Sequence, residues 1–435
     1  MFNKKQSPIQ VFSEIGRLKT VLVKRPGEEL SHITPSNMEE LLFSAILNWK
    51  KAGREHDEFT RILRENGIEV VYLEDLLVET WRAMKKNDKL HFIHKFVDES
   101  GVKNPLIQMK IFNFLSKRSV RGMFEAMIKG ITKFDLGMSL ARDVLVTQPM
   151  PNLYFTRDNF SSVGNGVILS RMKYKTRQRE TIFSRLVFKH HPVYKHTPIY
   201  FDSRKTASTM EGGDVFIYND KTLVIGVSDR TQKESLVELA QTIKREKATN
   251  FDTIIGVNVP HKWNLMHLDT WLTMVDHNKF LYSPNIASAL KFWKIDLTKK
   301  KISMVEHNTT LEDMIEQIIH VRPTLIPVAD NYSQEQVDIE THFDATNFLV
   351  IKPGLVIGYD RNVRTVQALR NNGVEVLTFD GNQLALGMGS ARCMSMPLYR
   401  EPISFNAFSG AAAQRIKLLK KIKNLRHKKD ALDQQ

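Results

Sequence analysis

The sequence predicts an α/β protein built from repeated hairpin, helix and strand units, with a helical segment inserted near the N-terminus. Two long segments repeat one order of apolar and turn residues, and a third hairpin is related to them. One stretch in the first third of the chain has helical spacing with few β-like alternations. Since such units cannot bury their apolar faces alone, we expect them to close on one another around a shared axis.

The N-terminal segment indicates a strand, a helix and a second strand. The strand Leu18–Val23 ends before the turn residues Arg25-Pro26-Gly27. Helical spacing then runs from about Met38 to Asn66, and Gly67 separates it from the strand Ile68–Leu73. This order is the first unit of the predicted fold.

The next segment is rich in Lys, Met, Phe and Leu at helical spacing and predicts three or more helices between residues 78 and 133. We therefore divide the chain into a first unit (1–77), a helical insertion (78–145), the remaining units (146–401) and a basic tail (402–435).

Two segments carry the internal repeat. Both Val215–Thr231 and Phe348–Asn362 form a hairpin pattern with Leu-Val-Ile-Gly and an Asp-Arg pair, and each leads into a helix and a strand, 254–259 or 374–379. Asn159–Met172 has a related hairpin pattern. A doubly wound sheet is the alternative, but no Gly-x-Gly-x-x-Gly follows the first strand, so dinucleotide binding lacks support.

Composition is that of a globular protein: 435 residues, 42% hydrophobic and 26% charged. No apolar run reaches the roughly 18 residues of a membrane span. The segment Met1 to Pro8 lacks the apolar region of a secretory signal. We therefore expect a cytoplasmic protein.

The net charge of +15 and pI of about 9.6 come partly from the C-terminus. Eight Lys and Arg residues lie between 415 and 429, where apolar residues recur every three positions. Both a basic amphipathic helix and a solvated tail are compatible with this pattern. The chain has no zinc-finger spacing and no RNP-type aromatic pattern, so neither a nucleic acid nor a membrane is an expected partner.

Four short segments combine dense polar residues with adjacent apolar strands. They are Met150–Asp158, Met210–Asp214, Met266–Thr270 and Gly387–Pro397.

Cys393, in the last of these segments, is the only cysteine, so no intramolecular disulfide can form. A lone cysteine is often a small buried apolar residue. However, Gly387 and Gly389 allow a close backbone approach just before it. We also expect Arg392 and nearby backbone amides to favour its thiolate, which is how a nucleophile would be presented.

The other three segments supply carboxylates and one imidazole. His267 and Asp269 face the same way if their segment is extended, and they suit either acid–base chemistry or a metal. Glu211 could present a carboxylate or belong to an ordinary turn, and Asp158 could belong to a surface pair with Arg157. Several carboxylates suit a planar cation such as a guanidinium. The residues alone indicate a thiol hydrolase or a metal hydrolase acting on a small substrate.

At these segments the chain resembles the arginine deiminases, most closely the mycoplasmal type. The resemblance also includes Val11–Gly16, Arg25–Leu30 and Arg392–Pro397. It runs in the family's order over nearly the whole chain up to about Glu401, and it does not cover the tail.

The resemblance implies the guanidine-modifying (pentein) fold: five hairpin-helix-strand modules in a pseudo-fivefold α/β propeller, with a helical insertion and an active site at the axis. It implies hydrolysis of L-arginine to L-citrulline and ammonia, the first step of arginine degradation, with water as second substrate. It also implies no cofactor, no metal, and a homo-oligomer, a dimer.

Residue roles follow from the family's motifs. Cys393 is the nucleophile, and Asp158 and Asp269 hold the guanidinium nitrogens. His267 protonates the departing ammonia and then activates water, while Glu211 fixes the imidazole. A thiouronium intermediate on Cys393 follows from these roles.

Four further residues match the family's substrate contacts. Asn152, Arg177 and Arg230 are expected at the substrate's α-carboxylate, and Phe155 is expected along its aliphatic stem.

The chain departs from the family at a few positions. Asn159 stands where the family usually has Pro, and Ala329, Asp330 and Ala345 stand where it usually has Gly. These changes could strain a loop near the site. A low-activity paralogue that acts as a binding protein, or another guanidine-modifying enzyme, is therefore the alternative.

Overall fold

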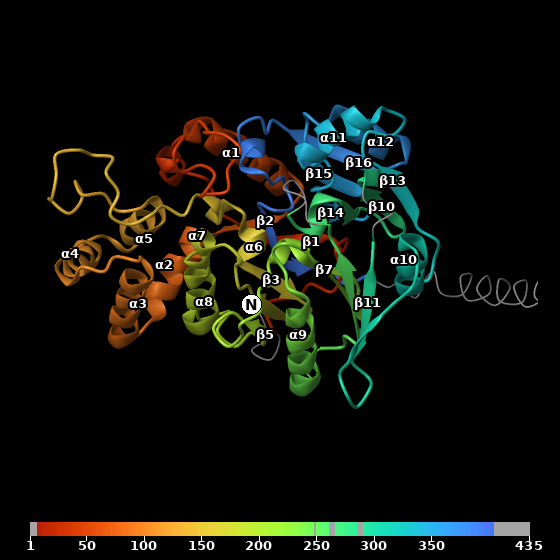
Figure 1. The fold of residues 1–435 in the computed structure, drawn as a ribbon, viewed down its shortest axis with the longest axis horizontal. Helices are drawn as coiled ribbons and strands as arrows, with labels where there is room; N and C mark the ends of the chain where they lie inside the picture. The colour runs from red at the N-terminus through yellow and green to blue at the C-terminus, as the bar shows by residue number, and fades with distance from the viewer. Residues whose placement is uncertain (1–6, 248, 261–265, 286–289, 404–435) are drawn as a thin grey trace, which may run out of the picture.

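The computed structural model describes residues 7–247, 249–260, 266–285 and 290–403 and has a mixed α/β fold with five separate sheets (Figure 1). The alternative of one doubly wound sheet is therefore wrong for the described ranges. The basic pattern of residues 415–429 lies outside them.

Each sheet contains the same three-stranded unit. Two strands pair antiparallel, and a third strand pairs parallel with the second of them. The strands of the five units, in this order, are β17 (Met396–Arg400), β1 (Leu18–Val23) and β2 (Glu69–Tyr72); β3 (Phe160–Val163), β4 (Gly166–Leu169) and β5 (Ile199–Asp202); β6 (Val215–Asn219), β7 (Thr222–Val227) and β8 (Thr253–Asn258); β9 (Leu272–Met274), β10 (Lys279–Tyr282) and β13 (Thr324–Pro327); β14 (Leu349–Lys352), β15 (Leu355–Tyr359) and β16 (Glu375–Phe379).

A helix connects the two parallel strands of each unit, because a parallel pair needs a long crossover. These helices are α1 (Trp49–Glu65), α8 (Thr181–His190), α9 (Lys233–Glu246), α10 (Leu311–Ile319) and α12 (Val363–Asn371). The third sheet is extended by β11 (Phe292–Asp296) and β12 (Met304–Glu306), which follow β8 as antiparallel strands.

The three predicted hairpins are confirmed, and their turns have the expected causes. Gly354 and Gly164 have φ values of +73° and +60°, which glycine adopts without strain. The side chain of Asn219 accepts hydrogen bonds from the backbone of Lys221 and Thr222. The residue pattern alone did not predict the β9–β10 hairpin or the pairing of β17 with β1, because β9 is short and β17 comes from the other end of the chain.

The first unit confirms both predicted strands but corrects the predicted helix. Helix α1 begins at Trp49 rather than near Met38, because Asn48 caps it by accepting a hydrogen bond from the backbone of Lys51. It ends as expected before Gly67, which has a φ of +75°.

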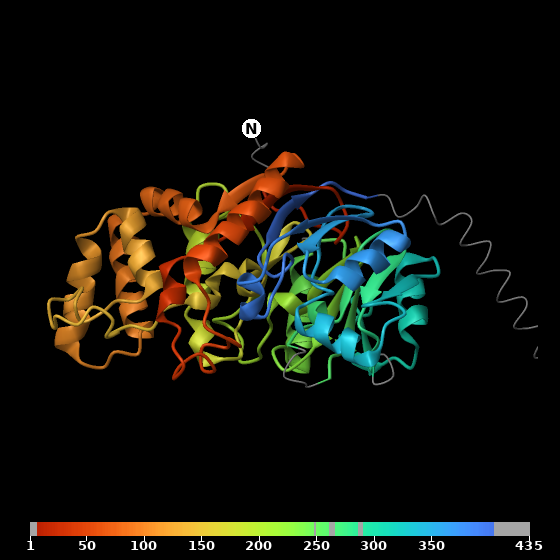
Figure 2. The same cartoon turned by 90° about the horizontal axis from the view of Figure 1, so that it is seen from above.

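Four helices follow β2 and form one end of the molecule, away from the later sheets (Figure 2). They are α2 (Leu73–Ala83), α3 (Lys86–Glu99), α4 (Pro105–Ser116) and α5 (Val120–Lys129). Trp81, Phe92 and Phe124 pack together among them. The expected helices are thus present, beginning at Leu73, while the domain boundaries drawn at 78 and 145 stay predictions.

Within the described ranges, no helix combines the length and apolar character that crossing a membrane requires. The cytoplasmic location stays a prediction.

Candidate functional site

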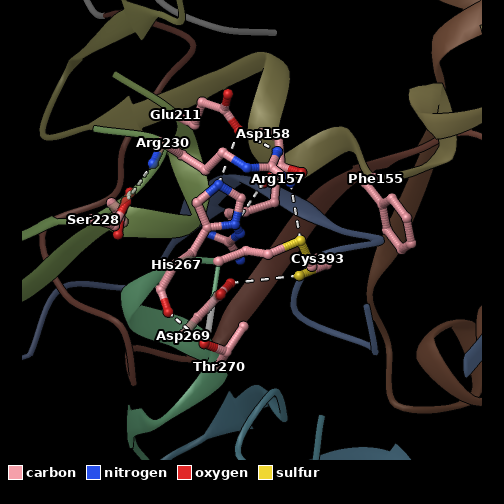
Figure 3. A network of polar contacts seen from close by, with 12 residues as sticks. Phe155, Arg157, Asp158, Glu211, Ser228, Arg230, His267, Asp269, Thr270 and Cys393 are labelled. Atoms are coloured by element: carbon pink, nitrogen blue, oxygen red, sulfur yellow. Dashed lines mark hydrogen bonds and ion pairs between the residues drawn. The ribbon is translucent and has the colours of Figure 1, made fainter. Parts of the chain in front are cut away.

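One pocket collects the segments that precede the first strands of different units. Helix α6 (Thr156–Asn159) comes before β3, the 3-10 helix η3 (Gly212–Asp214) before β6, η4 (Leu268–Thr270) before β9, and Cys393 before β17. Seven of the nine predicted site residues line the pocket: Asn152, Phe155, Asp158, Arg177, Arg230, His267 and Cys393. The other two, Glu211 and Asp269, contact these lining residues directly (Figure 3).

Glu211 holds one nitrogen of the His267 ring. It is fully buried, and its carboxylate oxygen Oε2 lies 3.0 Å from His267 Nε2. The same oxygen accepts a hydrogen bond from Arg230 Nη1 at 3.3 Å, and Oε1 accepts one from the backbone of Lys173. Burial alone would raise the pKa of Glu211, but Arg230 and His267 outweigh it and lower this pKa to about 2.

The second ring nitrogen of His267 faces Asp158. His267 Nδ1 lies 4.0 Å from Asp158 Oδ1. Burial would lower the pKa of His267, but Asp158, Glu211 and Asp214 together raise it to about 9. Close packing of this ring requires Gly213, because a Cβ atom there would lie 2.5 Å from Nδ1. His267 is therefore an imidazolium at neutral pH.

Cys393 lies beside a second carboxylate. Its thiol donates to Asp269 Oδ2 at 3.5 Å, and Arg392 Nη1 donates to the same oxygen at 2.8 Å. Arg392 is in turn held by the backbone oxygen of Val215 at 2.9 Å and by Glu14 at 3.4 Å. Asp269 is thus fixed in place by a buried cation.

The electrostatics of Cys393 correct the expectation that the free thiol is readily ionised. Its side chain is 5% exposed and belongs to an apolar cluster with Tyr154 and Phe155. Burial first, and then Asp269, Asp158 and Asp344, raise the pKa of the thiol well above its ordinary value, and Arg392 opposes them only partly. At neutral pH the sulfur is therefore protonated.

Two carboxylates of the site each have one oxygen that accepts no hydrogen bond from the described residues. Among the described residues, Asp158 Oδ1 and Asp269 Oδ1 are buried and have no hydrogen-bond partner. A buried acceptor without a donor is costly unless a ligand or water supplies one. A planar cation with several N–H donors would satisfy both oxygens next to the sulfur, and an imidazolium is available as a general acid.

The four residues predicted to contact the substrate's α-carboxylate and aliphatic stem line the pocket. Three of them form hydrogen bonds with other groups of the protein. Arg177 Nη1 donates to Asp158 Oδ2 at 2.8 Å, and Arg230 pairs with Glu211. The amide of Asn152 donates to the backbone oxygen of Leu41 at 2.7 Å. The Phe155 ring packs on Tyr154, with ring centroids 4.0 Å apart.

Two residues ahead of β14 also belong to the site, and we did not predict them. The side chain of Asn347 accepts a hydrogen bond from the backbone of Cys393 at 2.9 Å. Burial and then Asp269 raise the pKa of Asp344 to about 8. The available signal was their position in the repeat: like Asp158 and Cys393, they come just before the first strand of a unit.

The departures from the family pattern have different structural consequences. Ala329 is buried with a φ of +47°, a conformation that favours glycine. Ala345 is also buried, but it is not among the described residues with positive φ. Asn159 lies at the end of α6, where its amide contacts the backbone oxygen of Phe155 at 3.5 Å. Ala329, Asp330 and Ala345 do not line the pocket described above.

No group of three or more His, Cys, Asp or Glu residues in the described segments is arranged to hold a metal ion.

Comparisons with known proteins agree with one another. A family model described as "Arginine deiminase" matches residues 39–400. The chain is 50% identical to an arginine deiminase of Metamycoplasma arthritidis, over 93% of this chain and 99% of that protein. It is 48% identical to one of Metamycoplasma hominis, over 93% and 100%. Among solved structures, SxtG, an amidinotransferase of Microseira wollei, matches with a TM-score of 0.53 and 15% sequence identity. The match covers 91% of this chain and 98% of SxtG, and at this identity it shows a similar fold alone.

Proposed function

Because this chain belongs to the arginine deiminase family, we propose that it hydrolyses L-arginine to L-citrulline and ammonia with Cys393 as the nucleophile. The observation that carries the proposal is that two carboxylate oxygens of the site, Asp158 Oδ1 and Asp269 Oδ1, accept no hydrogen bond from the described residues, while the Asp269 carboxylate contacts the buried thiol of Cys393. The enzyme is a hydrolase acting on a guanidino C–N bond.

Substrate binding orients the reacting carbon. The guanidinium N–H groups donate to Asp158 and Asp269, so the central carbon lies next to Cys393 Sγ. The cation also neutralises the two carboxylates that raise the pKa of the thiol, so the thiolate forms when substrate is bound and its proton leaves to solvent. A neutral urea group lacks this charge, which explains selectivity for guanidines.

The sulfur then adds to the guanidinium carbon, and the terminal C–N bond breaks. His267, an imidazolium with a pKa of about 9, gives its proton to the departing nitrogen, which leaves as ammonia. Glu211 holds Nε2, so Nδ1, which faces Asp158 and the pocket, delivers this proton. The product of this step is a thiouronium intermediate on Cys393.

Water completes the reaction. The now neutral His267 removes a proton from water, the hydroxide adds to the thiouronium carbon, and the C–S bond breaks. As the C–S bond breaks, the hydroxyl proton of the adduct passes through solvent to the released ammonia, which becomes ammonium. Citrulline is released, Cys393 returns as a thiolate and His267 as an imidazolium. The carbon, nitrogen and proton counts therefore balance, with one water consumed and one ammonium formed per arginine.

The other end of the substrate is proposed to meet Arg177, Arg230 and Asn152, which bind the α-carboxylate, while Phe155 packs on the aliphatic stem. Their position in the pocket supports this role. The guanidinium of Arg177 donates hydrogen bonds to Asp158 and Glu180. Binding of the substrate's carboxylate would therefore require the Arg177 side chain to reorient.

We also propose that the five units form a closed pseudo-fivefold propeller around the site. In support, each unit contacts the next in chain order, and the last contacts the first. The pairs in contact are β17 with β3, α6 with η3, β7 with η4, α12 with β13, and β1 with β14.

A homodimer is proposed through α4. This helix leaves Leu106 and Met109 exposed at 66% and 55%, and Leu140, in the segment that follows α5, is exposed at 93%. Exposed apolar residues gathered in one region often mark an interface. Sedimentation of Leu106→Glu with Met109→Glu should show a monomer where the wild type is dimeric, and a monomeric wild type would exclude the proposal.

The deciding experiment measures citrulline and ammonia release from L-arginine by the purified protein, with chelator present. Equimolar release by the wild type and none by Cys393→Ala are expected. Release by Cys393→Ala would exclude the role of Cys393. A folded wild type that binds L-arginine without turnover would favour the binding protein, and turnover of methylated arginine or amidino transfer instead would favour another guanidine-modifying enzyme.

A further inference from the structure

Asn347 occupies, in the fifth unit, the place that reactive residues occupy in the other units. It lies just before β14, as Asp158 lies before β3 and Cys393 before β17. Its side chain is fully buried. The proposed chemistry uses no group from this unit, so a buried amide at this place needs its own explanation.

The first set of contacts joins Asn347 to the nucleophile segment. Its side-chain oxygen Oδ1 accepts hydrogen bonds from the backbone of Cys393 at 2.9 Å and of Ser390 at 3.3 Å. Its backbone oxygen accepts a third from the backbone of Arg392 at 3.2 Å. Three backbone N–H groups between Ser390 and Cys393 therefore donate to Asn347.

The second set joins the same residue to the loop of the guanidinium-binding carboxylate. Asn347 Nδ2 donates to the backbone oxygen of Asp269 at 3.4 Å, and Thr346 Oγ1 donates to the same oxygen at 2.9 Å. One side chain thus spans two segments that come from different units and are more than a hundred residues apart in the chain.

We infer that Asn347 is a positioning residue, which sets where Cys393 Sγ lies relative to the Asp269 carboxylate. This inference rests on the proposed function, because that separation decides whether a guanidinium held by Asp269 presents its carbon to the sulfur. Attack requires the reacting atoms to be about 3–3.5 Å apart and aligned, and a displacement of about 1 Å can cost on the order of 100-fold in rate.

An amide suits this place better than a carboxylate does. It can accept from Cys393 and donate to Asp269 at once, and it carries no charge. The thiol already faces the carboxyl groups of Asp269, Asp158 and Asp344. A further negative charge beside the sulfur would oppose formation of the thiolate.

The test uses Asn347→Ala and the nearly isosteric Asn347→Asp, with Asn219→Ala as the matched control. Asn219 is also buried, accepts from two backbone N–H groups and donates to one backbone oxygen, that of Ile318, but at the β6–β7 turn. Two readouts are needed: kcat and KM for L-arginine, and the pH dependence of alkylation by iodoacetamide, which can report only on Cys393, the chain's single cysteine.

We expect Asn347→Ala to lower kcat on the order of 100-fold, with a smaller change in KM. Asn347→Asp should keep both acceptor contacts but require a higher pH for alkylation. Asn219→Ala should lose stability while keeping the wild-type kcat and alkylation profile. Wild-type kcat and alkylation in either folded Asn347 variant, or equal effects from Asn219→Ala, would overturn the inference. If the wild type itself releases no citrulline, the proposed function fails, and the alkylation comparison still tests the role of Asn347.

Discussion

Replacing Glu211 by Gln should shift the pH at which catalysis is lost. Glu211 contributes both a hydrogen bond and a negative charge to the raised pKa of His267. The value of about 9, against the ordinary 6.5, corresponds to about 3 kcal/mol in favour of the imidazolium, at about 1.4 kcal/mol per pKa unit. Gln keeps the size of the side chain and removes its charge.

The size of the shift follows from the remaining neighbours. Asp158 and Asp214 still raise the pKa of His267 in the variant, while burial still lowers it. Loss of one opposite charge within contact distance moves a pKa by about 1–3 units. The alkaline limb of kcat/KM, which reports on the free enzyme, should therefore move from near pH 9 toward neutral pH by about 1–2 units.

The assay is citrulline formation at low L-arginine concentration between pH 5.5 and 10, on the order of ten pH values, in buffers of constant ionic strength. Glu79→Gln is the matched control, because Glu79 also pairs with a histidine, His191, at 3.1 Å but outside the pocket. Its profile should match the wild type. If the alkaline limb lies at the same pH in Glu211→Gln, Glu79→Gln and the wild type, His267 is not the general acid whose pKa Glu211 raises, and the assignment is refuted.

Two further predictions concern stability. Ala329→Gly should relieve the left-handed backbone at φ +47°, a gain of about 1–2 kcal/mol. Both alanines are buried, so Ala329→Gly and Ala345→Gly each also lose a buried methyl group, about 0.8 kcal/mol, and roughly 0.4–1 kcal/mol from a more flexible unfolded chain. Urea denaturation should therefore show Ala345→Gly as the less stable variant by about 1–2 kcal/mol, and equal shifts would contradict the strain argument. Asp344→Asn should change how stability depends on pH. Its folded pKa of about 8 lies above the ordinary 3.8, so the wild type loses stability as pH rises between these values. The variant should equal the wild type near pH 4 and exceed it by at least ~1 kcal/mol near pH 8.5; parallel curves across this range would contradict the burial argument.

The pattern of the sequence was sufficient to predict the repeated hairpins. Alternating apolar residues around Gly164 and Gly354 are local signals, because turn residues and strand periodicity depend on neighbours in the chain. The same holds for Gly67 at the end of α1. The start of α1 was harder, since residues 38–48 have helical spacing but the Asn48 cap decides where the helix begins.

The sequence also determined the inventory of the proposed chemistry. Cys393, His267, Glu211, Asp158 and Asp269 were identified from segments that share polar residues beside apolar strands, and the resemblance supplied their roles. What the chain order could not give was their mutual geometry, because these residues come from four different units of the fold.

Only the tertiary structure decided the electrostatics and the support of the site. The sequence suggested that Arg392 would favour a thiolate, but burial and three carboxyl groups from other units outweigh it and keep the thiol neutral. Asn347 has no reactive side chain, so no motif singles it out. Its importance arises from hydrogen bonds to Cys393 and Asp269, contacts that exist only after the units have packed together. Turns, strands and helix ends depend on neighbouring residues in the sequence. The pKa of a buried group depends instead on the residues that the fold packs against it.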